Sequence, residues 1–244
     1  MIESSRDEAC VVSEAVAALR RSSVATVSAT LLRRGLRNQC LIGIRPVADR
    51  TDVMVGPAFT LRFIPAREDI DTMAWLARPD NVQRRAIEEC PVGAVLVIDA
   101  RSCIRAASAG DLMARRLRFR GCAGMVTDGG FRDTAGIVEA GLPAYQRENA
   151  PCASPAGLHP VDIGQPIGCA GVAIYPGDFV MGDGEGVIVI PAGIIEDVAR
   201  DTASASDYEA FAAEEIDNGT ALFDIFPATD RSIEAFRRWS QAEN

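Results

Sequence analysis

The sequence of 244 residues contains no lysine, so all 25 of its basic residues are arginines. Catalysis through a lysine Schiff base is therefore excluded. Histidine is nearly as rare, because His159 is the only one. A single histidine excludes a metal site of several histidines and most zinc hydrolase sites. It also excludes a Ser-His-Asp triad built elsewhere in the chain. Any metal ion must be held mainly by oxygen, which favours magnesium, manganese or calcium.

Other absences bear on location and partners. No apolar run is long enough to span a bilayer, and the first eight residues do not resemble a signal peptide. Seven cysteines are scattered without a Cys-x-x-Cys pair, which indicates reduced thiols. The 34 acidic residues outweigh the arginines to give a net charge of −9, which disfavours binding to nucleic acid. We therefore expect a globular cytoplasmic protein that binds neither membrane nor nucleic acid.

What the chain does contain is an alternation of helical and extended segments. Helical spacing over residues 8–34 breaks at Arg21-Ser-Ser, with Ser22 or Ser23 capping a second helix. Strands are expected at 53–63, 94–99, 121–128, 168–175, 178–181 and 186–190. Further helices are expected at 81–90, 133–140, 192–203, 206–216 and 231–239, and one more follows residues 107–113 and ends at about residue 120. Strands that alternate with helices favour parallel pairing. This predicts one mixed α/β domain over residues 1–244, with a core at about 24–200 and a C-terminal helical arm at about 204–244.

The stretch from residue 107 to 133 carries the side chains best suited to chemistry. Asp111 lies at one predicted strand-to-helix turn, and Arg132 and Asp133 lie at the next. Helix N-termini present free N–H groups and a partial positive charge, both of which favour anions. Two carboxylates and a guanidinium there suit a small carboxylate and a hard divalent cation. The structural alternatives are a helix-stabilising aspartate, worth about 0.3–1 kcal/mol, and a local ion pair.

Three further features have simple structural interpretations. His159 lies in a loop-like stretch and is interpreted as a surface or structural residue. The four arginines between residues 115 and 120 are interpreted as a solvated face or a subunit contact. The glycine-rich segment 182–186 lacks the Lys-Ser/Thr ending and the following helix of a phosphate loop, so a β-turn is predicted.

The spacing of the charged residues resembles a known signature. Gly110-Asp111, then twenty residues, then Arg132-Asp133 is similar to the pattern of the 4-hydroxy-4-methyl-2-oxoglutarate / 4-carboxy-4-hydroxy-2-oxoadipate aldolase family, which also contains the RraA inhibitors of ribonuclease E. Residues 121–133 resemble the family's core strand and turn, and 176–191 its closing β segment. The similarity covers residues 24–220, and the N-terminal helix, segment 64–69 and long tail resemble a longer RraA-like subgroup.

The resemblance implies a β/β/α swivelling-type single domain with helical extensions at both ends. It implies assembly into homotrimers or homohexamers with active sites at subunit interfaces. It also implies a Mg²⁺- or Mn²⁺-dependent aldolase, a lyase that cleaves a 4-hydroxy-2-oxo acid to pyruvate and a second carbonyl compound.

The same resemblance assigns roles to individual residues. Asp133 would bind the metal ion, and Arg132 would stabilise the charge that develops on the 2-oxo oxygen. Asp111 would help a bound water to remove the 4-hydroxyl proton. Backbone N–H groups would bind the substrate carboxylate at Gly110, Asp111, Leu112 and Met113. A glutamate from a neighbouring subunit would reach the water, for which Glu209 matches best and Glu214 and Glu215 compete.

Three functions remain open at this stage. The first is the metal-dependent pyruvate aldolase. The second is an RraA-type protein that binds and regulates ribonuclease E without catalysis. The third is decarboxylation of oxaloacetate-like acids, which passes through the same pyruvate enolate and is compatible with the first as a side activity.

Overall fold

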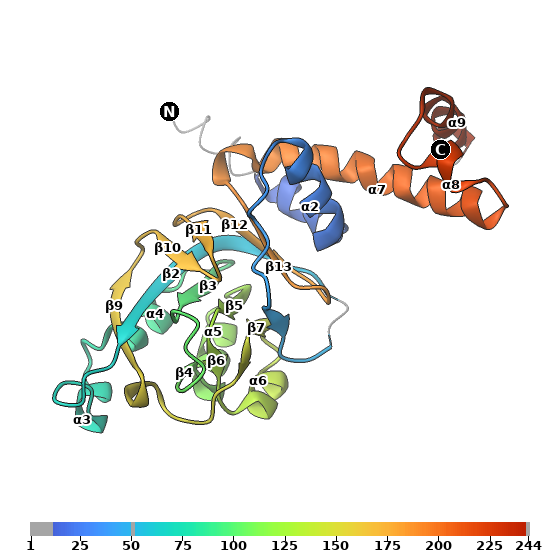
Figure 1. Cartoon of the computed structure of the whole chain (residues 1–244). Helices are drawn as coiled ribbons and strands as arrows, with labels where there is room; N and C mark the ends of the chain where they lie inside the picture. The colour runs from blue at the N-terminus through green and yellow to red at the C-terminus, as the bar shows by residue number, and fades with distance from the viewer. Residues whose placement is uncertain (1–11, 50–51, 243–244) are drawn as a thin grey trace, which may run out of the picture.

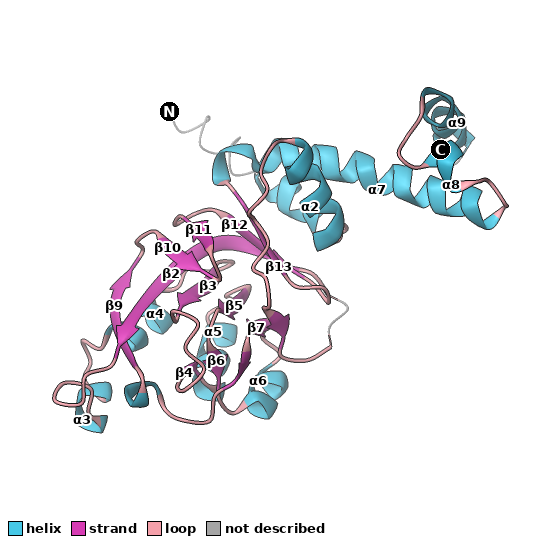
Figure 2. Cartoon of the chain, in the orientation of Figure 1, coloured by secondary structure: helices cyan, strands magenta, loops and turns pink. Residues whose placement is uncertain are grey.

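The computed structural model describes residues 12–49 and 52–242, so positions 8–11 of the expected N-terminal helix lie outside the described residues. The described chain forms a body of strands flanked by helices, from which a long helical arm extends (Figure 1). Figure 2 shows that the arm is entirely helix and loop. None of the helices within the described ranges has both the length and the apolar character that crossing a membrane requires.

Eight of the described strands form one sheet in the order β1-β7-β5-β3-β2-β12-β13, with β9 also paired to β2. Its strands are β1 (Arg45–Pro46), β2 (Met54–Pro65), β3 (Val95–Asp99), β5 (Gly124–Thr127), β7 (Ala144–Gln146), β9 (Leu158–Ile163), β12 (Phe179–Gly182) and β13 (Val187–Ile190). Parallel pairing joins β2, β3, β5 and β7, as the alternation of strands and helices predicts. The mixed α/β fold class is therefore confirmed.

Strand β2 connects the two parts of this sheet. Its first residues pair antiparallel with β12, its centre pairs parallel with β3, and its end pairs antiparallel with β9, with a bulge in this pairing between Arg62 and Phe63. Bulges bend a strand and increase its twist. The sheet therefore curls until it is nearly closed (Figure 2).

Both faces of the parallel strands are buried. On β3, Leu96 and Ile98 face a core shared with the flanking helices, whereas Val95 and Val97 face a core inside the curled sheet. This explains why residues 94–98 are continuously apolar, since strands covered on both sides show no polar alternation. A third core lies between β12, β13 and the helices α2 and α7.

Residues 12–19 are helical, and the α-helices that follow are α2 (Val24–Arg33), α3 (Met73–Leu76), α4 (Val82–Glu89), α5 (Asp111–Phe119), α6 (Thr134–Ala140), α7 (Ile195–Asp217), α8 (Leu222–Ile225) and α9 (Asp230–Ala242). Ser23 caps α2, because its hydroxyl accepts from the Thr26 N–H at 3.1 Å. This is one of the two serines that the sequence proposes for the cap. Gly35, with φ of +83°, follows the end of α2.

Two expected segments are wrong. Residues 192–203 and 206–216 are not two separate helices, because α7 continues from one segment into the other. The helix contains neither glycine nor proline to interrupt it. The Ser204 hydroxyl donates to the Arg200 carbonyl one turn earlier at 3.2 Å, so this serine is accommodated inside the helix. Residues 168–175 are not one strand but a hairpin of β10 (Ile167–Cys169) and β11 (Val172–Ile174). Its turn residues, Ala170 and Gly171, have φ of +50° and +79°, which reverses the chain.

Candidate functional site

The candidate site begins at two short parallel strands that both lead into helices. These strands, β4 (Ala107–Ala109) and β6 (Gly130–Phe131), pair with each other with a register shift between Ala107 and Ala109, and β8 (Glu148–Asn149) pairs parallel with β6 on its other side. The pairing continues one residue further, where the Arg132 N–H donates to the Ala109 carbonyl at 3.1 Å. The parallel alignment therefore brings the N-termini of α5 and α6 to the same end of this small sheet.

Gly110 and Asp133 are the residues that turn the chain from strand to helix. Gly110 is the extended N-cap of α5, and a Cβ there would lie 3.0 Å from Arg132 Cγ and 3.4 Å from an Asp133 carboxylate oxygen. A side chain at this position would therefore press on the Arg132 and Asp133 side chains and displace them slightly. Asp133 is the N-cap of α6 with φ of +54°, a left-handed conformation that costs most residues free energy and that aspartate tolerates better than most. Strained caps of this kind gather at functional sites.

Asp111 lies in the first turn of α5 and faces α6. A Cβ on Gly136 of α6 would lie 2.8 Å from Asp111 Cβ and 2.9 Å from its Oδ2. On its own helix, Oδ1 accepts from the Leu112 N–H at 2.8 Å, and Oδ2 lies 3.9 Å from Arg115 Nε. Close packing of α5 on α6 therefore fixes the position of this carboxylate.

Arg132 and Asp133 are tied together and both reach solvent. The Arg132 Nε donates to Asp133 Oδ2 at 2.9 Å, and the two side chains are 42% and 47% exposed, against 28% for Asp111. The bond holds the guanidinium by Nε and leaves its two terminal nitrogens out of this contact. The structure thus brings the predicted Gly110, Asp111, Arg132 and Asp133 together at one accessible place.

This arrangement suits a hard divalent cation bound through few protein atoms. Among the described residues no three histidine, cysteine or acidic side chains gather as a metal cluster, which leaves single carboxylates such as Asp133 as candidates. Mg²⁺ is commonly held by one or two carboxylates, with waters and substrate oxygens as the remaining ligands. The donor set therefore fits the metal that the sequence predicts, with Asp133 as the residue that would hold it.

The turn before Arg132 rests on a carboxylate that sequence analysis missed. Asp128 is 2% exposed, and it accepts from the Ala100 N–H at 2.7 Å and the Ser102 N–H at 2.9 Å. These bonds hold Ser102 and its neighbour Arg101 at φ of +55° and +56°. An aspartate directly after a buried strand is the signal that identifies such a residue, but it does not distinguish a support from a catalytic acid.

Glu209 lies elsewhere in the chain. It is exposed on α7, where its Oε2 accepts from the Thr26 hydroxyl of α2 at 2.9 Å. Figure 1 shows α7 on the opposite side of the body from α5 and α6. The competitors Glu214 and Glu215 bond Trp239 and Thr220 of the arm. Within one chain none of these glutamates joins the Asp111 site, so a role for one of them at the site of a neighbouring subunit stays a prediction.

The remaining interpretations from sequence can be placed as well. His159 is structural: its Nδ1 lies 2.6 Å from the buried carboxylate of Asp71, and its ring stacks on Trp75. Arg115 and Arg116 pair on the surface with Glu139 and Glu88, in keeping with a solvated face. Segment 182–186 forms the turn between β12 and β13. The turn is closed by a hydrogen bond of 3.0 Å that the Asp183 N–H donates to the Gly186 carbonyl.

Comparison with known proteins identifies the family. The RraA-like profile, described as Aldolase/RraA, matches residues 10–189. The chain belongs to the RraA-like family. This membership agrees with the resemblance carried by Gly110-Asp111 and Arg132-Asp133.

Relatives of this RraA-like chain carry two kinds of name. A protein of Halalkalibacterium halodurans named "Putative 4-hydroxy-4-methyl-2-oxoglutarate aldolase" is 35% identical over 158 residues, which span 64% of this chain and 68% of that one. The crystal structure of Streptomyces coelicolor RraAS2, titled an unusual member of the RNase ES inhibitor RraA protein family, is 31% identical with a TM-score of 0.72, and the match covers 85% of this chain and 96% of that one.

A third relative supports the fold alone. An uncharacterized protein from Pseudomonas syringae pv. tomato is 22% identical with a TM-score of 0.77, and the match covers 87% of this chain and 92% of that one. With RraAS2 it confirms the RraA-like fold that the sequence implies, with helices added at the ends of the chain.

Proposed function

We propose that this RraA-like protein is a divalent-metal-dependent lyase that cleaves a 4-hydroxy-2-oxo acid to pyruvate and a second carbonyl compound. The observation that carries the proposal is the meeting of Asp111, Arg132 and Asp133 around Gly110, at the N-termini of two helices. The aldolase name of the 35% identical relative supports the same reaction class. Oxaloacetate decarboxylation is proposed as a side activity, since it forms the same enolate.

The roles of the residues follow from their positions. First-turn N–H groups of α5 that have no acceptor inside the helix would bind the substrate carboxylate. Asp111 would accept the 4-hydroxyl proton through a water, which breaks the bond between C3 and C4 and leaves the electron pair on the pyruvate unit. The Arg132 guanidinium, held at Nε by Asp133, would donate to the 2-oxo oxygen as negative charge develops there. A divalent ion held by Asp133 would supply Lewis-acid stabilisation of the same charge.

The test is a coupled assay for pyruvate release over a panel of 4-hydroxy-2-oxo acids and oxaloacetate, with magnesium or manganese. We expect activity to vanish in EDTA and to return when either metal is added. Asp133→Ala should stay inactive at every metal concentration. Glu148→Ala, which removes an exposed acid from the neighbouring strand β8, is the control and should keep its metal response. Full activity in chelator would contradict the proposal.

A regulatory role is the second candidate, because RraAS2 is 31% identical and its title places it among RNase ES inhibitors. Such a protein needs a binding surface and no metal. Inhibition of an RNase E-type enzyme by both the parent and Asp133→Ala, without pyruvate release by either, would favour it over the lyase.

A further inference from the structure

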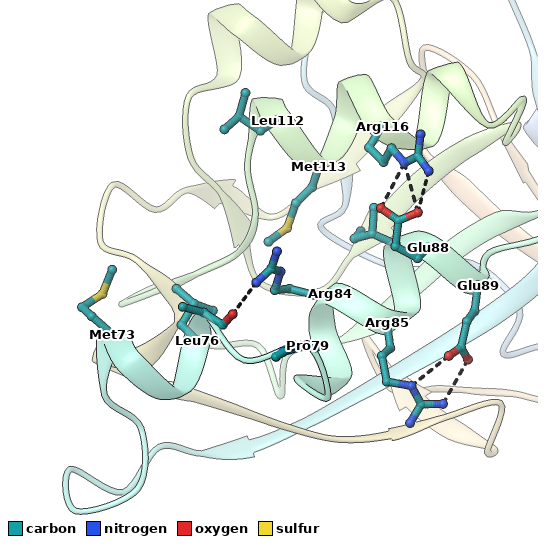
Figure 3. A pocket seen from close by; sticks show the side chains of 12 residues that line it. Met73, Leu76, Pro79, Arg84, Arg85, Glu88, Glu89, Leu112, Met113 and Arg116 are labelled. Carbon is teal, nitrogen blue, oxygen red and sulfur yellow. Dashed lines mark hydrogen bonds and ion pairs between the residues drawn. The ribbon is translucent and has the colours of Figure 1, made fainter.

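A cavity of about 620 Å³ lies between α3, α4 and α5, directly beside the candidate site. Most of its lining is apolar, and charged side chains lie around it (Figure 3). It is lined by Met73, Leu76, Ala77, Pro79, Arg84, Arg85, Ile87, Glu88, Glu89, Leu112, Met113 and Arg116. Its volume lies within the range of about 300–1,000 Å³ that is typical of small-molecule sites.

The wall formed by α3 is held in place by specific contacts. Asp71, just before α3, bonds His159 of β9, and Trp75 of α3 stacks on the same ring with 4.9 Å between centroids. On the other side, Arg84 Nη1 donates to the Ala77 carbonyl at 2.7 Å, which ties α4 to the end of α3. The cavity is therefore built by contacts within the chain.

The three arginines of the cavity are not equivalent. Arg116 pairs with Glu88 at 2.7 Å, and Arg85 pairs with Glu89 at 2.8 Å. The hydrogen bond from Arg116 is the main cause that lowers the pKa of Glu88. Among the described residues Arg84 forms no ion pair within 4.0 Å, although its charge also helps to lower the pKa of Glu88. Figure 3 shows its guanidinium between Leu76 and Met113, bonded to a backbone oxygen.

The cavity also adjoins the residues expected to bind substrate. Leu112 and Met113 line it from the first turn of α5. Met113 follows Asp111 by two residues, so its side chain points to the opposite face of the helix, toward the cavity, while Asp111 faces α6. Leu112 is 76% exposed, at the edge between the N-terminus of α5 and the cavity. A molecule whose carboxylate binds the free N–H groups at the start of α5 would reach the cavity by passing over Leu112.

We propose that the cavity binds the part of the substrate that is distal to the pyruvate unit, and that this part is an apolar chain or ring ending in an anionic group held by Arg84. The inference rests on the proposed function and names its substrate class: aldol adducts of pyruvate with apolar aldehydes that carry a terminal carboxylate. The apolar lining favours the chain, and a guanidinium that is hydrogen-bonded to a carbonyl and engaged in no close ion pair favours the anion.

Binding is tested without metal and without turnover, using octanoate as an anionic probe and octan-1-ol as its neutral match in calorimetric titrations. Arg84→Met, which keeps an apolar side chain of similar length, should weaken octanoate binding about tenfold or more. Arg85→Met is the matched control and should leave octanoate binding unchanged, since Arg85 is paired with Glu89. Met113→Glu is the second variant. It places a negative charge in the cavity, which repels the octanoate carboxylate, and should abolish octanoate binding in a protein whose circular dichroism is unchanged.

The link to catalysis is tested with the adduct of pyruvate and 8-oxooctanoate. Octanoate should inhibit pyruvate release from this adduct competitively. If octanoate binds through Arg84 and no substrate releases pyruvate, the binding site is supported and the proposed function fails. If pyruvate is released and octanoate binding does not depend on Arg84, or is blocked because a second copy of the chain fills the cavity, this inference is overturned and the proposed function stands.

Discussion

Arg132 is held at its ε nitrogen by Asp133, so its terminal nitrogens are presented in a defined direction. If they stabilise an enolate oxygen, their effect is greater in the transition state than in the ground state, and their loss lowers kcat more than it raises KM. We expect Arg132→Ala to lower kcat about 100- to 1,000-fold, and Arg132→Lys to restore little, because an ammonium lacks the planar fork.

The measurement is kcat for both aldol cleavage and oxaloacetate decarboxylation, since both pass through pyruvate enolate. Arg118→Ala serves as the matched control, because Arg118 is an exposed arginine in the last turn of α5, away from the helix N-terminus at the site. Near-normal turnover of a folded Arg132→Ala protein in both reactions would make Arg132 structural and the mechanism wrong.

Asp99, at the end of β3, gives a prediction about pH. Burial, followed by the nearby Asp128 carboxylate, raises the pKa of Asp99. A carboxyl whose pKa is higher in the folded state favours folding when protonated, so its contribution is fully present below its unfolded pKa of about 3.9 and is lost as pH rises through the folded pKa.

Asp99→Asn should therefore raise the free energy of unfolding at pH 7, and the gain should shrink toward pH 4. The substitution keeps an oxygen to accept from the Arg101 N–H, which lies 2.9 Å from Asp99 Oδ1. Urea unfolding at several pH values provides the measurement. Asp80→Asn is the control: Arg78 lowers the pKa of Asp80, so no stabilisation is expected there at pH 7. An equal gain for Asp99→Asn at both pH values would show that burial of the charge is not its cause.

At the level of elements, the packing of α5 on α6 determines where Asp111 lies. Gly136 has no room for a methyl group, because a Cβ would lie 2.8 Å from Asp111 Cβ. Gly136→Ala should therefore push the two helices apart, at a cost of about 1–3 kcal/mol in the free energy of unfolding, and should lower kcat with it. Gly193→Ala is the control, since no heavy atom lies within 4 Å of its added Cβ. Thermal unfolding and pyruvate release measure both effects, and unchanged kcat in Gly136→Ala would show that Asp111 tolerates displacement.

The features that depend on local residues are those that the sequence predicts best. The apolar runs of β3 and β5, the Ser23 cap and the two strand-to-helix turns depend on local residues, so their pattern is legible in one sequence. Gly136 beside Asp111 and Arg84 beside the cavity depend on contacts between helices that are distant in sequence. Neither position shows a local signal, because a glycine in a helix or an arginine on a surface has many ordinary explanations.

At the scale of the whole molecule, the arm is an extension with its own small core. The second half of α7 packs with α8 and α9 around Phe211 and Ile225, away from the cores of the body (Figure 1). Its tip leaves Leu222, Phe223 and Phe226 exposed by 56%, 91% and 61%. Apolar side chains gathered in this way are typical of surfaces that associate.

We therefore expect the protein to assemble as a trimer or a larger homo-oligomer in light scattering, with the arm contributing to the contact. Phe223→Asp with Phe226→Asp should lower the measured mass, because each new charge would have to be buried in the contact. Val92→Asp is the control; Val92 is 80% exposed at the start of the loop before β3, outside the arm.

Activity of the same variants shows whether assembly matters for catalysis. If a glutamate of the arm such as Glu209 acts at a neighbouring site, the dissociated variant should lose turnover along with mass. A monomer with full activity would remove that role, since no neighbour could supply the glutamate. It would leave the proposal for Asp111, Arg132 and Asp133 intact, because those three residues meet within one chain.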